Sequence, residues 1–429
     1  MNSGFPSDSY VSVRSAFENT IELAEIIPRS ERVCTLGAYK RVLAENIIAK
    51  TNIPPYNTSH MDGFAVKAEE ISSASNINPI ILKIKSKSEL NDIRRNSSYR
   101  YNHNTSYNKL RRGEAFEIST GGYLPTGADT VIPVEEVIIM GNEIKIELPF
   151  SKGAYVYHSG TDIKYKQQIL SKGQLLSAQD IALLASLQIK KILLFKKPKV
   201  GLIPTGSELS DNLEHLKPGQ KFNANSIVIA KLIEEAGGIP VDFGITSDDL
   251  SMICQKLIAA LKVCDLVLTM AGTSLGKHDL IQIAIDSLGK PGMIAHGIKL
   301  DRGRVTGIAV LKNKPIIALP GPIQGALNAF IVFASPMIRL LSGRLEKSLS
   351  TLMYATLTKP WQARRRFPDF LKVVYVKLSS SKKGIKAEPI VAETESMSLL
   401  SKASGYILVP ENVRKLVEGQ RVAVNLIRV

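Results

Sequence analysis

Three carboxylates follow strand-like segments in the middle of this chain, each in a polar or glycine-containing loop. Glu208 stands in PTGSEL, Asp248 in TSDDL and Asp279 in MAGTSLGKHD. Glycine loops and helix N-termini favour anions, because their backbone N–H groups can approach a ligand closely. Carboxylates repel such a ligand unless a divalent cation bridges them to it or one of them acts as an acid or base. This combination predicts catalysis on an anionic ligand.

Helix capping is the structural alternative for these acids. Asp248 and Asp249 both precede an amphipathic segment, which needs only one N-cap residue, and Asp279 precedes another such segment. His278 could donate a hydrogen bond to an anion, or could simply be exposed. From the residues alone, capping and catalysis both stay open.

Asp62 raises the same question in the segment TSHMDGFAV. Asp-Gly is a strong short-range hairpin signal, so the simplest interpretation is a turn that leads into a strand at Phe64. A functional role for Asp62 needs support from elsewhere in the chain.

Strand-like and helix-like segments alternate between residues 199 and 343. Apolar residues recur at helical spacing in the helix-like segments, as with Ile229, Leu232, Ile233 and Ala236. This alternation predicts a three-layer α/β domain, in which helices cover both faces of a mostly parallel sheet. Ligands of such domains bind beyond the carboxyl ends of the strands. The three acidic loops should therefore lie at the ligand site.

The flanking segments predict other folds. Two helical patterns, SVRSAFENTIELAEII and TLGAYKRVLAENIIA, lie near the start of the chain. Period-two segments from about residue 53 to 148 predict a small β domain. Strand-like pieces after residue 344, among them DFLKVVYVKL, GYILVP and QRVAVNLIRV, predict a terminal β domain.

Composition bounds the class of protein. The formal net charge of +16 makes an anionic partner plausible. Residues 83–112 are rich in Lys, Arg, Asn, Ser and Tyr; we interpret them as a long insertion, with a nucleic-acid patch as the less favoured alternative.

Cys34, Cys254 and Cys264 lack the paired spacing of a disulfide framework or zinc site. No apolar run approaches the ~20 residues of a membrane span and no signal pattern opens the chain, so we expect a cytoplasmic protein without membrane association.

Several common catalytic motifs do not occur in the sequence. There is no G-x-S-x-G elbow, no G-x-x-x-x-G-K-[ST] phosphate loop, no G-x-G-x-x-G after a strand and no H-x-x-x-H pair. These observations argue against a hydrolase elbow, a P-loop nucleotidase, a dinucleotide enzyme and a zinc protease.

The order of the motifs resembles the molybdopterin molybdenumtransferase family, which includes the E domain of gephyrin. The matching segments keep their spacing over about residues 15–343. They are SHMDGFAV, EISTGGYLPTGADTVIPVEE, GTDI, LLSAQDIALLASLQI, VGLIPTGSEL, DLVLTMAGTSLGKHDL and ALPG. No single motif is decisive, but the ordered set is highly specific, and the C-terminal domain matches mainly in position and length.

Residue-by-residue matching implies site residues of two kinds. The implied catalytic residues are Asp62, Thr120, Asp162, Glu208, Asp248 and Asp279. The implied binding residues are Gly206, Ser207, Gly272, Thr273, Ser274, Gly276, Arg304, Pro320 and Gly321. Asp248 and Asp279 are the implied ligands of Mg²⁺, which would neutralise a leaving phosphate. Through the same resemblance, Asp62 is expected to face an active site rather than only a turn.

The resemblance also implies an architecture and a reaction. It implies an elongated helical domain (8–50 and 150–195), an inserted β domain (51–149), a three-layer α/β domain (196–343) and a C-terminal β barrel (344–429). It implies a homodimer, with each active site between the α/β domain of one subunit and the inserted domain of the other. The family inserts molybdate, or alternatively tungstate, into adenylylated molybdopterin and releases AMP with the help of magnesium. The molybdopterin adenylyltransferase is an implied partner.

The chain departs from the family pattern in its anion-binding loops. The family's P-G-K-P segment reads RGRV at 302–305, and Asp301 stands where relatives often have a lysine. S-G-G-V-S reads MAGTS at 270–274, and L-P-G-N-P reads LPGPI at 319–323. We therefore carry three hypotheses: a transferase, a paralogue that binds molybdopterin or nucleotide as a scaffold or carrier, and a nucleic-acid-binding protein. Retention of the matched acids favours the transferase.

Overall fold

The computed structural model describes most of the chain in two compact units. The described residues are 10–85, 109–272, 279–344, 352–382, 384–391, 393 and 395–427. One unit comprises Met1–Glu45, Lys172–Ala185 and Ile189–Val429, and the other comprises Asn46–Ser171 with Ser186–Gln188. Most of the predicted basic insertion lies outside the described residues, as do Thr273, Ser274, Gly276 and His278.

A six-stranded sheet lies at the centre of the larger unit, in the order β16-β13-β17-β20-β19-β18. The bounds are β13 (Lys199–Pro204), β16 (Ile239–Asp242), β17 (Leu266–Met270), β18 (Pro291–His296), β19 (Gly307–Leu311) and β20 (Lys314–Leu319). β16, β13, β17 and β20 are parallel, whereas β19 is antiparallel to both β20 and β18. The predicted mostly parallel sheet is confirmed. The antiparallel strands β18 and β19 went unpredicted, because no helical crossover separates them to mark each one as a strand.

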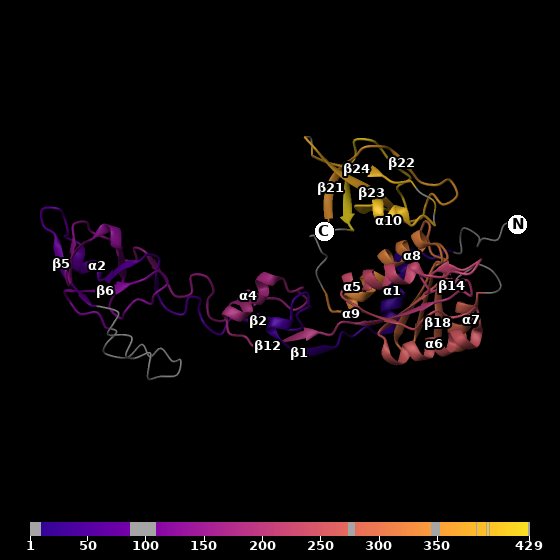
Figure 1. The fold of residues 1–429 in the computed structure, drawn as a ribbon, viewed down its shortest axis with the longest axis horizontal. Coiled ribbons are helices and arrows are strands. Elements are labelled where there is room, and N and C mark those ends of the chain that lie inside the picture. The colour runs from indigo at the N-terminus through magenta and orange to yellow at the C-terminus, as the bar shows by residue number, and fades with distance from the viewer. Residues whose placement is uncertain are drawn as a thin grey trace. The chain divides into compact units, whose positions relative to one another are not determined.

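Helices cover both faces of this sheet (Figure 1). α6 (Leu250–Val263) and α7 (Leu280–Ser287) lie on one face, and α1 (Val13–Ala24), α5 (Ala224–Glu235) and α8 (Ile323–Ala329) lie on the other. Ile229 and Ile233 of α5 are fully buried, as the helical spacing predicted. Burying such a side chain stabilises the fold by ~1.5–3 kcal/mol, so the apolar stripes hold the three layers together.

One long helix crosses the core of the larger unit. α8 continues through a π-helical turn, η5 (Phe330–Ala334), into α9 (Ser335–Leu341). Pro336 lies in the first turn of α9 and has no N–H to donate, so the helix widens just before it. Among the described residues, Ile323–Leu341 is the one stretch long and apolar enough to cross a membrane, but 67% of its apolar window is buried. It is accordingly a core helix.

A closed barrel forms the C-terminal part of the same unit. Its strands are β21 (Leu352–Leu357), β24 (Gly384–Pro389), β23 (Lys372–Ser381), β25 (Gly405–Val409) and β27 (Arg421–Leu426). Tyr375 of β23 is buried in the apolar cluster that also contains α8, and its hydroxyl donates to Oδ1 of Asn328 at 3.0 Å. The predicted C-terminal barrel is confirmed, and one buried side chain anchors it to the α/β core.

The smaller unit is built on a second six-stranded sheet, in the order β7-β4-β6-β5-β9-β8. The bounds are β4 (Gly63–Val66), β5 (Ile80–Lys85), β6 (Glu114–Ile118), β7 (Thr130–Pro133), β8 (Ile138–Met140) and β9 (Glu143–Ile146). Phe64, Ile132 and Ile144 fill one apolar cluster against it. The small β domain predicted from the period-two segments is present.

The expected helix in TLGAYKRVLAENIIA does not form. This segment contains a short 3-10 turn, η2 (Thr35–Gly37), and the strand β2 (Ile47–Ile48). Lys40 N donates to Leu176 O at 3.0 Å and Leu43 N to Gln174 O at 2.9 Å. Hydrogen bonds to distant segments thus take the backbone groups that a helix would have used. The preceding strand, β1 (Ser30–Cys34), pairs with β12 (Lys191–Phe195), and β2 pairs with β11 (Gln168–Leu170). Helix α4 (Ala178–Ser186) lies between β11 and β12 in the sequence.

The hairpin interpretation of Asp62-Gly63 is wrong, although the strand after it is confirmed. β3 (Thr58–Ser59) pairs with β10 (Val156–Tyr157), whereas β4 pairs with β6 and β7. The Asp-Gly dipeptide therefore joins strands of two different sheets. Local turn chemistry could not distinguish this link from a hairpin, because the partner strands lie far away in the sequence.

Gly63 is expected to tolerate no side chain. A Cβ added there would lie 2.0 Å from the carbonyl oxygen of Ile132, and forced overpacking typically costs ~1–3 kcal/mol. We expect Gly63→Ala to increase hydrogen–deuterium exchange of the β4, β6 and β7 amides. Gly37→Ala is the control, because its Cβ would meet only a Val33 methyl at 3.8 Å. Equal protection in the two variants would contradict the close packing of β4.

Candidate functional site

The carboxyl ends of three parallel strands are joined through Thr205, which is fully buried. Its N–H and Oγ1 both donate to Met270 O at the end of β17, at 2.9 and 3.0 Å. Gly206 N donates to Thr246 O at 3.0 Å, and Thr246 N donates to Pro204 O at 2.8 Å. We refer to these four hydrogen bonds as the Thr205 junction. It determines where the loop after β13 leaves the sheet.

The two aspartates at the start of α6 have different partners. Asp249 is the N-cap, and its carboxylate accepts from Met252 N at 2.8 Å. Asp248 is exposed, and its Oδ2 lies 3.3 Å from Ser207 N and 3.4 Å from Ser207 Oγ. Capping therefore explains Asp249 and leaves Asp248 beside the predicted binding residue Ser207.

Asp279 has the opposite surroundings, since only 5% of it is exposed. Its Oδ1 accepts from Ile281 N and Gln282 N at 3.1 Å each, which caps α7, and its Oδ2 lies 3.2 Å from Nε2 of His296. Burial raises the pKa of Asp279 above its usual value, and the hydrogen bond from Gln282 and the nearby His296 oppose that shift. Capping is confirmed for Asp279, and its catalytic role stays a prediction.

Two glycines of the predicted binding set have backbone conformations that disfavour a side chain. Gly272 has φ +70°, and a Cβ there would lie 2.8 Å from Thr205 Oγ1 and 2.9 Å from Ile281 Cγ1. Gly206 has φ +148°, and a Cβ there would lie 2.7 Å from Oε2 of Glu208. The loops after β13 and β17 thus bring bare backbone to the sheet edge, which is the property that an anion site needs.

A cavity of about 380 Å³ opens at this edge of the sheet. Glu208 and Lys221 line it together with Ala271 and Gly321, which belong to the loops after β17 and β20. Asn225 Nδ2 donates to Gly321 O at 2.8 Å and so ties the loop after β20 to α5. The structure therefore brings Glu208 into one cavity with part of the predicted binding loops.

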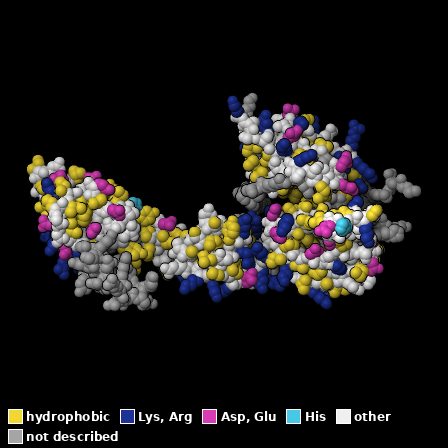
Figure 2. Space-filling model, in the orientation of Figure 1, with side chains coloured by type: hydrophobic (Ala, Val, Ile, Leu, Met, Phe, Trp, Pro, Cys, Tyr) yellow, Lys and Arg dark blue, Asp and Glu magenta, His cyan; other side chains and the backbone are white. Residues whose placement is uncertain are grey.

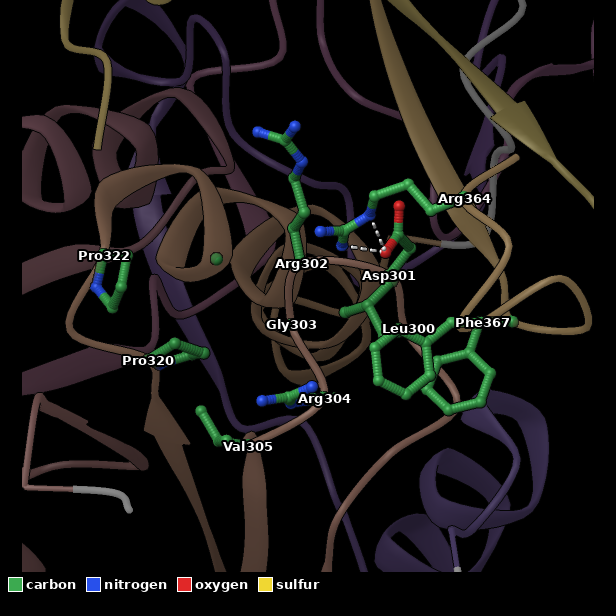
Figure 3. A pocket seen from close by; sticks show the side chains of 12 residues that line it. Leu300, Asp301, Arg302, Gly303, Arg304, Val305, Pro320, Pro322, Arg364 and Phe367 are labelled. Atoms are coloured by element: carbon green, nitrogen blue, oxygen red, sulfur yellow. Dashed lines mark hydrogen bonds and ion pairs between the residues drawn. The ribbon is translucent and has the colours of Figure 1, made fainter. Parts of the chain in front are cut away.

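A second cavity, of about 240 Å³, is lined by three arginines (Figure 3). Arg302 and Arg304 come from the segment before β19, and Arg364 comes from the barrel. The guanidinium of Arg304 lies 5.1 Å from the ring centroid of Phe367. Arg304 and Pro320, both predicted binding residues, lie in this cavity. We refer to it as the arginine cavity.

An acid reduces the positive charge of the arginine cavity. Arg364 Nε donates to Oδ1 of Asp301 at 3.1 Å, and its Nη2 donates to the same oxygen. Arg302 Nη1 donates to Gln324 Oε1, and burial lowers the pKa of Arg302 below its usual value. Guanidinium groups bind oxyanions well because their N–H groups form a fork. The cavity can accordingly hold an anion, with Asp301 as the competitor for Arg364.

In the smaller unit, two of the predicted catalytic residues, Asp62 and Thr120, are hydrogen-bonded to each other. Oδ1 of Asp62 accepts from Thr120 N at 2.7 Å and from Thr120 Oγ1 at 3.1 Å. Asp162 is also exposed in this unit, and its backbone N–H donates to Ile53 O at 3.0 Å. The structure thus holds Asp62 by Thr120 in a defined position and presents both carboxylates at the surface.

Sequence reasoning missed Arg302 and Arg364 as members of the arginine cavity. Arg364 lies 63 residues after Asp301 in the chain, and its segment matched the family only in position and length. The run of three arginines in ARRRF was the available signal. A charge run usually marks a solvated surface, so this run alone could not indicate a cavity.

The acids near the sheet edge permit a magnesium ion without forming a complete protein cage. Among the residues that the structure describes, no three His, Cys, Asp or Glu side chains form a group that could hold a metal ion. Mg²⁺ usually takes one or two carboxylates and completes its shell with water and substrate phosphates. Exposed Asp248 and Glu208 fit that pattern. Both carboxylate oxygens of Asp279 already have neighbours, and its predicted metal role stays a prediction.

The fold and these two cavities define a multidomain protein with a three-layer α/β domain, a β barrel, one cavity lined by Glu208 and Lys221 and one cavity lined by three arginines. Three family models match consecutive parts of the chain: the MoeA N-terminal region (domain I and II) at residues 11–187, the Probable molybdopterin binding domain at 201–340, and the MoeA C-terminal region (domain IV) at 354–427. Together they span both units.

Whole relatives match as well. Molybdopterin molybdenumtransferase 2 of Mycobacterium tuberculosis is 27% identical over 422 residues, covering 96% of this chain and 99% of its own. Molybdopterin molybdenumtransferase of Staphylococcus aureus is 28% identical over 84% of this chain and 83% of its own. The crystal structure of the molybdopterin biosynthesis MoeA protein from Pyrococcus horikoshii aligns with a TM-score of 0.81 and 30% identity, over 98% of this chain and all of that one. The chain belongs to the MoeA family, the molybdopterin molybdenumtransferases of molybdenum cofactor biosynthesis.

Substitutions at Asp279 should separate capping from charge. Asparagine caps a helix about as well as aspartate, whereas loss of a cap to alanine costs ~1 kcal/mol. We expect Asp279→Asn to keep the denaturant midpoint and Asp279→Ala to lower it. A midpoint that falls equally in both variants would mean that the carboxylate charge beside His296, rather than the cap, supports α7.

Proposed function

We propose that this chain inserts molybdate, or tungstate, into adenylylated molybdopterin and releases AMP. The observation that carries the proposal is that the acids matching the family motifs occur within a match over nearly the whole chain, and that two sets of them have defined surroundings. In the smaller unit, Thr120 holds the carboxylate of Asp62. In the larger unit, Glu208 and Asp248 lie beside the Thr205 junction.

Different residues of the chain would bind different parts of the substrate, according to their charge. The bare backbone at Gly206 and Gly272 would hold phosphate oxygens, and Arg302 and Arg304 would hold the oxyanion. Mg²⁺, held by Asp248 with Glu208 or Asp279, would neutralise the phosphate that leaves with AMP. Asp62, fixed by Thr120, would act as an acid or base or orient the reacting groups.

The oligomeric state, the location and the partner of the protein are part of the same proposal. We propose a cytoplasmic homodimer that receives its substrate from the molybdopterin adenylyltransferase. The four-domain division with bounds near residues 50, 150, 195 and 343 also stays a prediction, and so does a site formed between two subunits. Sedimentation that shows only monomer would contradict the dimer.

AMP release is the direct test. We expect the wild type to release AMP from adenylylated molybdopterin in a reaction that needs both oxyanion and Mg²⁺. Asp62→Asn and Asp248→Asn should each slow release by about 10²-fold, because acid–base and charge roles are typically of that size. Glu235→Gln, an exposed acid of α5, is the control and should match the wild type. Release at the wild-type rate in both aspartate variants would refute the assigned roles.

A second candidate, a paralogue that binds its ligand without turnover, has one observation in its favour. Asp301 holds Arg364 inside the arginine cavity, so one of the three arginines is already paired. Tight binding of adenylylated molybdopterin by the wild type, without AMP release under any oxyanion, would establish this candidate. The first test therefore decides between the two.

Removing the Asp301 carboxylate should improve oxyanion binding. Asp301→Asn frees Arg364 for the ligand. The side chains of Arg364 and Asp301 are 47% and 12% exposed, and an ionic hydrogen bond with one partner at the surface is worth on the order of 1 kcal/mol, or about fivefold in KM for the oxyanion. Asp369→Asn is the control, because Asp369 makes the same two hydrogen bonds with Arg414 at a more exposed place that does not line the cavity. Steady-state AMP release over a range of molybdate measures both. An unchanged KM in Asp301→Asn would mean that the oxyanion does not reach Arg364.

A further inference from the structure

Three segments of the smaller unit form a narrow ribbon beside its main sheet. Thr58 of β3 is paired antiparallel with Tyr157 of β10 on one side and with Tyr123 on the other. Directly opposed residues share one face of such a ribbon, and so do alternate residues along each segment. Tyr56 and His60 lie in the bends on either side of β3, two residues from Thr58, and alternation from Thr58 predicts that they share the face of Tyr123 and Tyr157.

Ring contacts agree with this placement. The rings of Tyr56 and Tyr123 have centroids 5.4 Å apart and meet edge to face, and the rings of His60 and Tyr157 have centroids 4.8 Å apart. Together the four rings form what we term the aromatic face. Tyr56 and Tyr157 are each 38% exposed, and His60 is exposed as well. A group of exposed rings held by strand pairing is suited to stacking against a flat ligand.

A negative charge lies at one end of the aromatic face. Asp62 follows His60 by two residues, and its carboxylate is held by Thr120, three residues before Tyr123. A carboxylate accepts hydrogen bonds and repels lone pairs. The pterin edge that carries the 2-amino group and an adjacent ring N–H presents donors side by side. Adenine places ring nitrogen lone pairs next to its amino group, so the charge favours a pterin over adenine.

We propose that the aromatic face of Tyr56, His60, Tyr123 and Tyr157 stacks against the pterin ring of the substrate, with Asp62 facing the donor edge of that ring. This inference rests on the proposed function and deepens it, because it assigns the smaller unit to recognition of one substrate part.

Direct binding to the full-length protein tests this role. The probes are neopterin, a fluorescent pterin without phosphate, and AMP. We expect Tyr157→Leu to weaken neopterin binding about tenfold, since loss of one stacking ring typically costs ~1–3 kcal/mol. Tyr157→Phe keeps the ring and should bind as the wild type does. Tyr165→Leu is the control, because Tyr165 is 59% exposed in the same unit and lies outside the aromatic face, next to Lys166.

Three outcomes would overturn the assignment. Equal neopterin affinity in wild type and Tyr157→Leu would exclude stacking. AMP binding that weakens in Tyr157→Leu while neopterin binding does not would place the adenine on the face instead. A smaller sedimenting species in Tyr157→Leu would make the face a subunit contact. The proposed function can fail separately. If neopterin binding depends on Tyr157 but the wild type releases no AMP, the transferase proposal is wrong and the assignment of the aromatic face to a pterin stands.

Discussion

The Thr205 junction is the constraint on which the larger unit's site depends. A buried hydroxyl and three backbone N–H groups tie the ends of β13, β16 and β17 together within 3.0 Å. β13 and β17 end in register at Pro204 and Met270, and Thr246 ties the loop after β16 to the same place, so the loops open at one edge, where Ser207 meets Asp248. Gly272 packs directly on Thr205, so the same hydroxyl also sets the path of the loop after β17. Buried hydrogen bonds of this kind are costly to leave unmade, which makes the edge rigid.

Acidic and basic side chains both lie on the visible face of the larger unit (Figure 2). Asp249 and Asp279 are used as helix caps, and Asp279 is buried next to His296. Asp248 and Glu208 of the larger unit are exposed, as are Asp62 and Asp162 of the smaller unit, and water screens exposed charges from one another. Three arginines line the arginine cavity, and Asp301 holds one of them. Repulsion between like charges within the larger unit is therefore limited.

Particular elements show which parts of the fold could be predicted from the sequence. The stripes of α5 and α6 and the buried strands of the parallel sheet could be predicted, because one-sided burial of a helix and two-sided burial of a strand each leave a clear hydrophobic pattern. The pattern after residue 344 predicted a terminal β domain, and only the family resemblance implied that it is a barrel. The segment 35–49 misled, because its alanines and leucines fit a helix while its backbone bonds to residues 174–176. Arg364 and the aromatic face stayed hidden, because their neighbours are distant in the chain and each residue type is common on surfaces.

By itself, the sequence determined the layered α/β core, the presence of two β domains and the identity of the acids that match the family motifs, since periodicity and motif order are properties of the chain alone. Only the tertiary structure decided what those acids touch. Asp249 caps α6 whereas Asp248 lies beside Ser207, and Asp279 caps α7. Asp62 accepts hydrogen bonds from Thr120, and Asp301 accepts them from Arg364. The physical reason is that hydrogen bonds and ion pairs act over about 3 Å in space, and strand pairing brings together residues that no local pattern relates.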